Sequence, residues 1–318
     1  MFESAMDLLK EYLSLFLVIP AILWAGFYFS IRLRWLQFTF LKKAIQLMSP
    51  KKRAGGISSF NAVAAVLGGN LGTGNVAGVA VALSMGGPGA LFWMWFMAFL
   101  TAAIKYVDCY LGVKYREKNA LGNYVGGPMY YILKGLNRPK TAKLFCLFTV
   151  LAALTGGNLV QVNSMSLPIA AAGYNPLWLG LVMAVLVACT VLGGMKRFAL
   201  VVTSVVPISA LFYIGACLYI IVGYSEHILP AFEIIIKSAW GVECAVGGAT
   251  GCMVFQAMRT GFDRALFATE SGLGLAPIMH APVTSPAEEY PNHVTQGIIS
   301  IFSPFVVVIV TTLTGIVL

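Results

Sequence analysis

The sequence predicts an all-α protein that crosses a membrane several times. Of its 318 residues, 59% are hydrophobic and 10% are charged, whereas roughly a quarter of the residues of a soluble domain are charged. The mean hydropathy is +0.84, and the apolar residues form runs near the ~20 residues that a helix needs to cross a bilayer. This composition excludes a disordered chain, a disulfide-rich secreted module and a water-soluble globular domain.

Eight apolar runs are candidate membrane spans. They cover about 12–31, 58–84, 90–112, 144–172, 177–194, 198–223, 238–258 and 292–318. The segment 113–143 is expected to form a helix or hairpin at the membrane interface, and the amphipathic segment 224–237 is expected to lie at the opposite interface.

The distribution of Lys and Arg predicts that the N-terminus lies outside. When the eight runs alternate in direction, 18 of the 21 Lys and Arg residues fall between runs on one side of the membrane. Cytoplasmic loops are enriched in Lys and Arg, so this side is predicted to be cytoplasmic. The net charge of +9 then reflects orientation and contact with anionic lipid heads, and no nucleic acid partner is expected.

The second run is interrupted by small and polar residues. Between positions 66 and 78 it holds five Gly and two Asn, and each Gly costs about 1 kcal/mol of helix stability relative to Ala. Close helix packing explains Gly78, but the glycines of 68–75 lie on more than one face. Main chain that leaves a helix within the bilayer is tolerated only inside protein or beside a cavity. A break in the helix is therefore predicted at 68–75.

The seventh run carries a smaller copy of this pattern at 246–251. Two interrupted spans, five spans apart, are typical of secondary transporters built from inverted repeats. In such proteins the amides at half-helix ends bind an anionic group, and freed carbonyls bind a cation. A phosphate-binding loop at 72–74 is excluded because no strand precedes it and no Lys follows it.

Few ionisable residues lie within the runs. Lys105 and Asp108 share a helical face, and snorkelling or a structural pair is favoured over a proton relay. The absence of mid-span histidines and paired acids argues against an enzyme and favours Na⁺, which neutral oxygens bind. In the fourth run, Asn158 and Gln161 share a face, where they either hydrogen-bond to a neighbouring helix or line a substrate pocket.

Several stretches resemble the sodium:alanine symporter family, whose members are alanine or glycine:cation symporters. They are 72–80, 86–95, 114–118, 124–131 and 157–164, with a weaker match at 266–277. At 268–272 the chain reads Ala-Thr-Glu-Ser-Gly where the family usually has Ser-Asn-Glu-Ala-Gly. The resemblance implies a leucine-transporter-type fold with a five-plus-five inverted repeat. Residues 1–57 would form an extra span and a basic loop, residues 58–223 the first repeat, and residues 224–318 part of the second.

The resemblance also implies a function and a set of site residues. It implies Na⁺-coupled symport of a small neutral amino acid, alanine or glycine, across the cytoplasmic (inner) membrane of a prokaryote. The expected substrate contacts are Gly72, the amides of Thr73 and Gly74, the side chain of Gln161, and Gly247, Gly248 and Thr250 from the second repeat. The expected Na⁺ ligands are the Asn75 side chain with the Asn70 carbonyl for one ion, and the carbonyls of Gly68 and Leu71 for a second.

Members of this family are longer than the chain. Only two of the five helices of the second repeat fit before Leu318. We therefore expect that the chain alone does not transport, and that a complementary C-terminal polypeptide would restore transport. The alternative is a degenerate or binding-only membrane protein.

Overall fold

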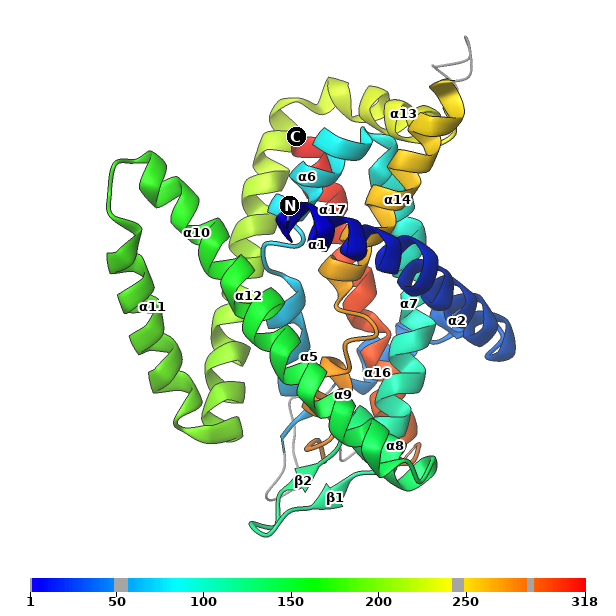
Figure 1. Ribbon diagram of the computed structural model, residues 1–318, viewed down its shortest axis with the longest axis vertical. Helices are drawn as coiled ribbons and strands as arrows, with labels where there is room; N and C mark the ends of the chain where they lie inside the picture. Colours follow the sequence, from blue (N-terminus) through cyan, green and yellow to red (C-terminus); the bar gives the residue numbers. More distant parts are fainter. Residues whose placement is uncertain (1, 49–56, 242–248, 285–288) are drawn as a thin grey trace.

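The computed structural model describes residues 2–48, 57–241, 249–284 and 289–318, and it is almost entirely helical (Figure 1). Five helices in these ranges are long and apolar enough to cross a membrane: Leu9–Arg32, Gly89–Lys114, Pro139–Ala171, Arg197–Gly223 and Asn292–Val317. Two shorter helices, Ala77–Gly86 and Pro176–Val191, are also apolar. The prediction of an all-α membrane protein is confirmed.

The first half of the chain carries the N-terminal helices, the interrupted span and a small hairpin. Its elements are α1 (Phe2–Leu13), η1 (Ser14–Val18), α2 (Ile19–Arg32), α3 (Leu36–Thr39), α4 (Leu41–Leu47), α5 (Ser59–Asn70), α6 (Ala77–Gly86), α7 (Gly89–Lys114), β1 (Glu117–Lys118), β2 (Tyr124–Val125), α8 (Pro128–Gly135) and α9 (Pro139–Ala152).

The second half begins with the continuation of the long helical rod that starts with α9, and it ends in two consecutive helices. Its elements are η2 (Ala153–Leu159), α10 (Val160–Ala171), α11 (Pro176–Val191), α12 (Gly194–Gly223), η3 (Ser225–His227), α13 (Ile228–Ala239), α14 (Ala249–Thr269), α15 (Leu275–His280), α16 (Asn292–Ser300) and α17 (Phe302–Val317). A π-helical turn, η2, joins α9 to α10 within one rod.

The predicted break in the second run is confirmed. The N-cap Ser58 accepts a hydrogen bond from the amide of Asn61 and starts α5. The helix ends at Asn70, and α6 begins only at Ala77. The six residues between them form turns because Gly and Asn supply little helix stability. Part of the main chain of this stretch bonds locally: the Asn75 amide donates to the Gly72 carbonyl, and the Gly78 amide donates to the Thr73 carbonyl.

The sequence analysis placed a second break at 246–251. Residues 242–248 lie outside the described part of the chain, but 249–251 belong to α14, which runs without interruption to Thr269. The chain leaves the helix at 270–274, where Glu270, Gly272 and Gly274 have positive φ angles, and α15 begins at Leu275.

The prediction that the seventh span ends near 258 was wrong because it treated Arg259 and Arg264 as loop residues. Both lie inside α14. Arg259 forms an ion pair of 2.6 Å with Glu11 of α1, and the nearby Asp263 accepts a hydrogen bond from Ser14 of η1. This charged face of α14 is packed against the N-terminal rod. The two arginines are thus helix residues and do not count among the basic residues of loops.

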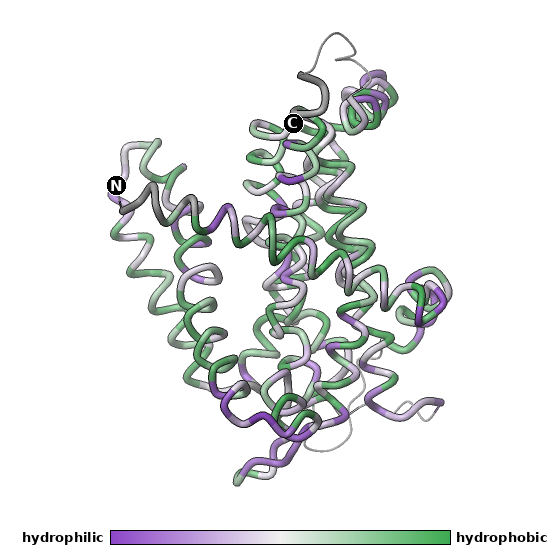
Figure 2. The backbone as a smooth tube through the Cα atoms, turned by 45° about the vertical axis from the view of Figure 1, so that its right-hand side comes forward, coloured by the Kyte–Doolittle hydropathy of each residue, from purple (hydrophilic) through white to green (hydrophobic). Residues whose placement is uncertain are grey.

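Helix α7 is the centre of the packing. It contacts α14, α16, α17, α2, α15 and α13. Its buried face, with Leu91, Met94 and Met97, belongs to the main hydrophobic cluster. By contrast, α10 and α11 have no buried residues and lie to one side of the molecule, at the left of Figure 1. Figure 2 shows hydrophobic residues along the rods and hydrophilic ones gathered at one end.

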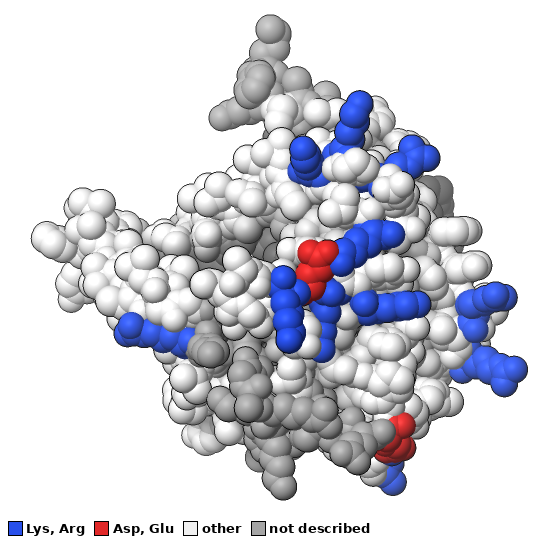
Figure 3. Space-filling model, turned by 90° about the horizontal axis from the view of Figure 1, so that it is seen from below, with Lys and Arg blue, Asp and Glu red and all other residues white. Residues whose placement is uncertain are grey.

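The two segments expected at the membrane interfaces fold as short elements between the long helices. Residues 113–143 contain both a hairpin and a short helix: β1 and β2 pair antiparallel, with Glu117 opposite Val125, and α8 follows. The amphipathic segment near 224–237 forms η3 and α13 at the other end of the molecule (Figure 1). We call the end that carries β1 and β2 the hairpin end. It is the end where Lys and Arg gather (Figure 3).

Candidate functional site

The two breaks lie against each other in the interior. Helix α5 packs against α15, and α6 packs against α14. A Cβ on Gly74, in the first break, would stand 3.1 Å from the Cα of Ala268, beside the second break. Since α5 leads to α6 whereas α14 leads to α15, the two interrupted helices run in opposite directions.

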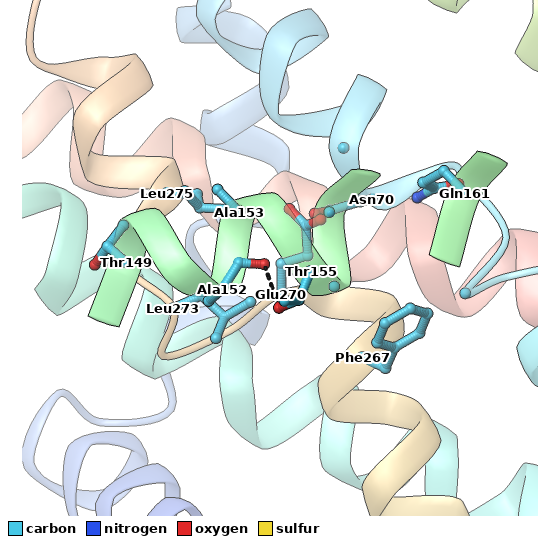
Figure 4. A pocket seen from close by; sticks show the side chains of 14 residues that line it. Asn70, Thr149, Ala152, Ala153, Thr155, Gln161, Phe267, Glu270, Leu273 and Leu275 are labelled. Carbon is cyan, nitrogen blue, oxygen red and sulfur yellow. Dashed lines mark hydrogen bonds between the residues drawn. The ribbon is translucent and has the colours of Figure 1, made fainter. Parts of the chain in front are cut away.

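A cavity of about 250 Å³ opens between the breaks (Figure 4). Asn70 and Gly74 line it from the first break, and Phe267 and Glu270 line it from α14 and the second break. The third wall is the π-helical turn of the α9–α10 rod, with its small residues; π-turns often mark functional sites. The lining from this wall is Thr149, Ala152, Ala153, Thr155, Gly156, Gly157 and Gln161.

Each glycine around the first break makes room for a different neighbour. A Cβ on Gly68 would stand 3.0 Å from Val206 of α12, and one on Gly69 would stand 2.8 Å from a carboxylate oxygen of Glu270. A Cβ on Gly72 would stand 2.6 Å from the Gln161 amide nitrogen. The dense glycines therefore serve close approach as well as the break itself.

The predicted residue Gln161 reaches the first break. Its Oε1 accepts a hydrogen bond of 3.1 Å from the amide of Thr73. The two amide side chains singled out in the fourth run therefore have different surroundings. Gln161 is half-buried at the break, whereas Asn158 is exposed. The Thr73 amide, expected to bind a substrate carboxylate, is occupied by this side chain in the structure, while Gly74 lines the cavity.

The predicted ion ligands Asn70 and Asn75 lie together. Both are buried, and the Asn75 side-chain amide donates a hydrogen bond to the Asn70 carbonyl. The Asn75 carbonyl accepts a bond of 2.9 Å from Thr314 of α17, whose hydroxyl also lies 2.7 Å from that of Tyr213. Leu71, Gly72 and Asn75 line a second cavity of about 280 Å³ on this side of the break.

Buried polar atoms without a hydrogen-bond partner concentrate at the two breaks. Within the described residues they include both side-chain polar atoms of Asn70, the Thr73 hydroxyl, Oδ1 of Asn75 and the Ser271 hydroxyl. Leaving such a group unpaired costs roughly 1–3 kcal/mol.

Sequence reasoning missed Glu270 as a site residue. Its carboxylate faces Gly69 and lines the cavity, although its segment was interpreted as an inner loop. An acidic residue followed by Ser271, Gly272 and Gly274 in an apolar setting is the signal that marks it.

Of the predicted contacts from the seventh run, only Thr250 is described, and it is not part of this cluster. Gly247 and Gly248 lie outside the described residues. Thr250 is in the first turn of α14, about 28 Å along the helix from Thr269 at 1.5 Å per residue. That turn is at the end of α14 remote from the cavity.

Lys105 and Asp108 share a face of α7, as expected, but they do not act as an isolated pair. Lys105 is buried and interacts electrostatically with Glu270 as well as with Asp108. Asp108 accepts a hydrogen bond of 2.9 Å from Tyr131 of α8. A positive charge thus lies within electrostatic range of the carboxylate in the cavity.

The fold and the site define a helical membrane protein with two opposed breaks around a cavity, and the comparisons with known proteins agree. A family model for the sodium:alanine symporter family matches residues 1–318. The chain belongs to this family.

Three relatives illustrate the range of the family. The chain is 37% identical to the sodium/alanine symporter AgcS of Methanococcus maripaludis over 93% of the chain and 66% of the relative. It is 41% identical to an uncharacterized transporter of Haemophilus influenzae over 92% of the chain and 64% of that protein. It is 35% identical to the probable sodium/glutamine symporter GlnT of Bacillus subtilis over 90% and 59%. The chain thus spans less than two thirds of the length of these relatives.

Proposed function

We propose that the chain binds a small neutral amino acid together with Na⁺ between the two breaks, as part of a sodium-coupled symporter. The observation that carries the proposal is the group of unpartnered buried polar atoms at the breaks. One relative is named a sodium/alanine symporter and another a probable sodium/glutamine symporter. Alanine or glycine is the proposed substrate, and glutamine is the alternative to be tested.

The ends of the broken helices provide the charge pattern that a zwitterion needs. The C-terminal end of α5 is the negative end of its helix dipole, and it faces the Glu270 carboxylate across Gly69. Lys105 supplies one positive charge within electrostatic range of this carboxylate, and the nearby negative end of α5 favours a further cation in the cavity. The substrate ammonium group is the proposed occupant.

The carboxylate belongs at the other half of the same break. The N-terminal end of α6 is the positive end of its dipole, and the Gly74 amide precedes it. Gln161, which accepts from Thr73 in the structure, would turn its amide group to donate to the substrate carboxylate. Gly72 keeps this side chain close to the break.

The proposed first Na⁺ lies where the Asn75 amide now meets the Asn70 carbonyl. The amide NH₂ group of Asn75 donates a hydrogen bond to the Asn70 carbonyl oxygen, whereas Oδ1 of Asn75 has no partner. A sodium ion would replace the amide hydrogen and bind both oxygens, since hard cations prefer oxygen ligands. The Gly68 carbonyl, in the last turn of α5, and that of Leu71 are the proposed ligands of a second ion.

The opposed breaks support the proposed inverted repeat, with residues 58–223 as the first unit and 224–318 as part of the second. The hairpin end is the proposed cytoplasmic side because Lys and Arg gather there (Figure 3). We propose accordingly that the N-terminus lies outside a prokaryotic inner membrane.

Uptake of radiolabelled alanine into proteoliposomes tests transport against the binding-only alternative. Accumulation of alanine driven by a Na⁺ gradient would support symport. Na⁺-dependent binding without accumulation would favour the binding-only alternative. The comparisons do not support a separate complementary polypeptide, and that expectation stays a prediction. Parallel assays with glycine and glutamine decide the substrate.

A further inference from the structure

We propose that Arg116 is a latch that holds the hairpin end of the substrate path closed, by tying the end of α7 to the segment that follows α15. The inference rests on the proposed function, because it assigns the latch to the path between the site and the cytoplasm. The stretches 114–118 and 124–131, which carry part of the family resemblance, do not line the cavity. The proposed latch assigns them a function.

The guanidinium group of Arg116 makes two hydrogen bonds to main-chain carbonyls. Its Nη1 donates to the carbonyl of Ala281 over 2.8 Å and to that of Val283 over 2.7 Å. These carbonyls lie just past the end of α15, and that of Val283 also accepts a hydrogen bond of 3.0 Å from the side-chain amide of Asn292. Hydrogen bonds from a charged donor are stronger than neutral ones, so Arg116 fixes the end of α15.

The hairpin orients the Arg116 side chain. The guanidinium group lies 3.9 Å from the centre of the Tyr124 ring, which is in β2, and arginine stacks well on aromatic faces. Burial lowers the pKa of Arg116 from its usual value, while the neighbouring Tyr124 opposes this shift. Arginine remains charged at neutral pH.

Glycines allow the hairpin and α7 to pack closely against α15. A Cβ on Gly112 of α7 would stand 2.5 Å from Cβ of Pro277, and one on Gly127 would stand 2.6 Å from Ile278. A Cβ on Gly126 would collide with the Gly112 carbonyl and would stand 3.0 Å from Cβ of Arg116. Helix α15 is thus held between the end of α7 and the end of the hairpin.

The same short segment also joins the two broken helices. Ile57, just before α5, forms a parallel bridge with Val283, and the Thr284 amide donates to the Ile57 carbonyl over 3.2 Å. Below the breaks, Gln296 of α16 links His280 of α15 to Ser59 of α5 with bonds of 2.9 and 3.0 Å. For a substrate to leave by this end, α5 and α15 must separate, and the Arg116 bonds oppose that movement.

The test measures access to the closed interior and does not require transport. Ser271, buried at the second break, is replaced by Cys in a variant without the native cysteines, and its reaction with a charged maleimide is followed in nanodiscs. Arg116→Ala is expected to raise the labelling rate at least about tenfold, because a shift in the open population raises access in proportion. The labelling rate of Arg116→Lys should lie between those of the parent and Arg116→Ala, since a single ammonium group lacks the planar, forked donors of a guanidinium group.

Lys118→Ala is the matched control, because Lys118 also lies over the Tyr124 ring but is exposed at the hairpin. It should label like the parent. Gly126→Ala is the second test and should also increase labelling, since its Cβ would wedge the hairpin from α7. Equal labelling rates in Arg116→Ala and Lys118→Ala, in proteins that elute as single species, would overturn the latch. Labelling is read without alanine or Na⁺, so this result is separate from failure of the proposed function.

Discussion

The carboxylate of Glu270 faces the main chain of Gly69, with one oxygen 2.8 Å from the position that a Gly69 Cβ would occupy. The two residues are 201 positions apart, in different interrupted helices. Their contact fixes how the two breaks meet. It also sets an acidic group against the negative end of α5, and a cation relieves this arrangement.

Replacing Gly69 with Ala should therefore displace Glu270. The added methyl group has no room beside the carboxylate, and the proposed ammonium site would widen. We expect alanine affinity to fall at least about tenfold, which is 1.4 kcal/mol of binding free energy. Isothermal titration calorimetry measures it. Gly180→Ala, where a Cβ would meet nothing within 4 Å, is the matched control and should bind like the parent.

Glu270→Gln keeps the shape of the side chain and removes its charge. A hydrogen bond to a charged group contributes about 1.5–3 kcal/mol, so alanine affinity should fall roughly 10- to 100-fold. Equilibrium binding of radiolabelled alanine to purified protein gives the value. Unchanged affinity would remove Glu270 from the ammonium site and leave it as a structural partner of Lys105.

Asn75→Ala should weaken the dependence on Na⁺ more than it reduces expression. The substitution removes Oδ1, which has no partner in the structure. The proposed ion then keeps the Asn70 carbonyl but has one ligand fewer. The Na⁺ concentration for half-maximal alanine binding should rise at least about tenfold. Asn158→Ala, at an exposed amide of η2, is the control. The same half-maximal Na⁺ concentration in both variants would exclude Asn75 as an ion ligand.

Gly261→Ala should destabilise the protein without touching the site. A Cβ there would stand 2.5 Å from the Ala90 carbonyl oxygen and 2.7 Å from Cβ of Trp93, between α14 and α7. Overpacking of this kind costs about 1–3 kcal/mol. The thermal midpoint measured by gel filtration should fall. Gly215→Ala, at a position with open space, should keep the parental midpoint, and equal midpoints would contradict the close packing.

The first break was predictable because its signals are local. Five glycines and two asparagines within thirteen residues disfavour a helix whatever surrounds them. The position of Gln161 relative to this break was left open, because a helical face shows that a side chain has a partner but not which one. Only the packing brings its Oε1 to the Thr73 amide.

The break after α14 was missed because a charge pattern was interpreted as a loop. Arg259 and Arg264 looked like cytoplasmic residues, but Arg259 pairs with Glu11, 248 positions away. Such a long-range pair cannot be inferred from periodicity or hydropathy. Once α14 continues through both arginines, its end moves to Thr269, and the acidic residue after it becomes part of the site.

The most direct test of the account is calorimetric titration of alanine into the purified chain in Na⁺ and, separately, in choline at equal ionic strength. The account predicts saturable binding in Na⁺ and at least about tenfold weaker binding in choline, because the ion and the zwitterion share the first break. Equal affinity in both solutions, with the protein folded, would contradict a site in which the two bind together.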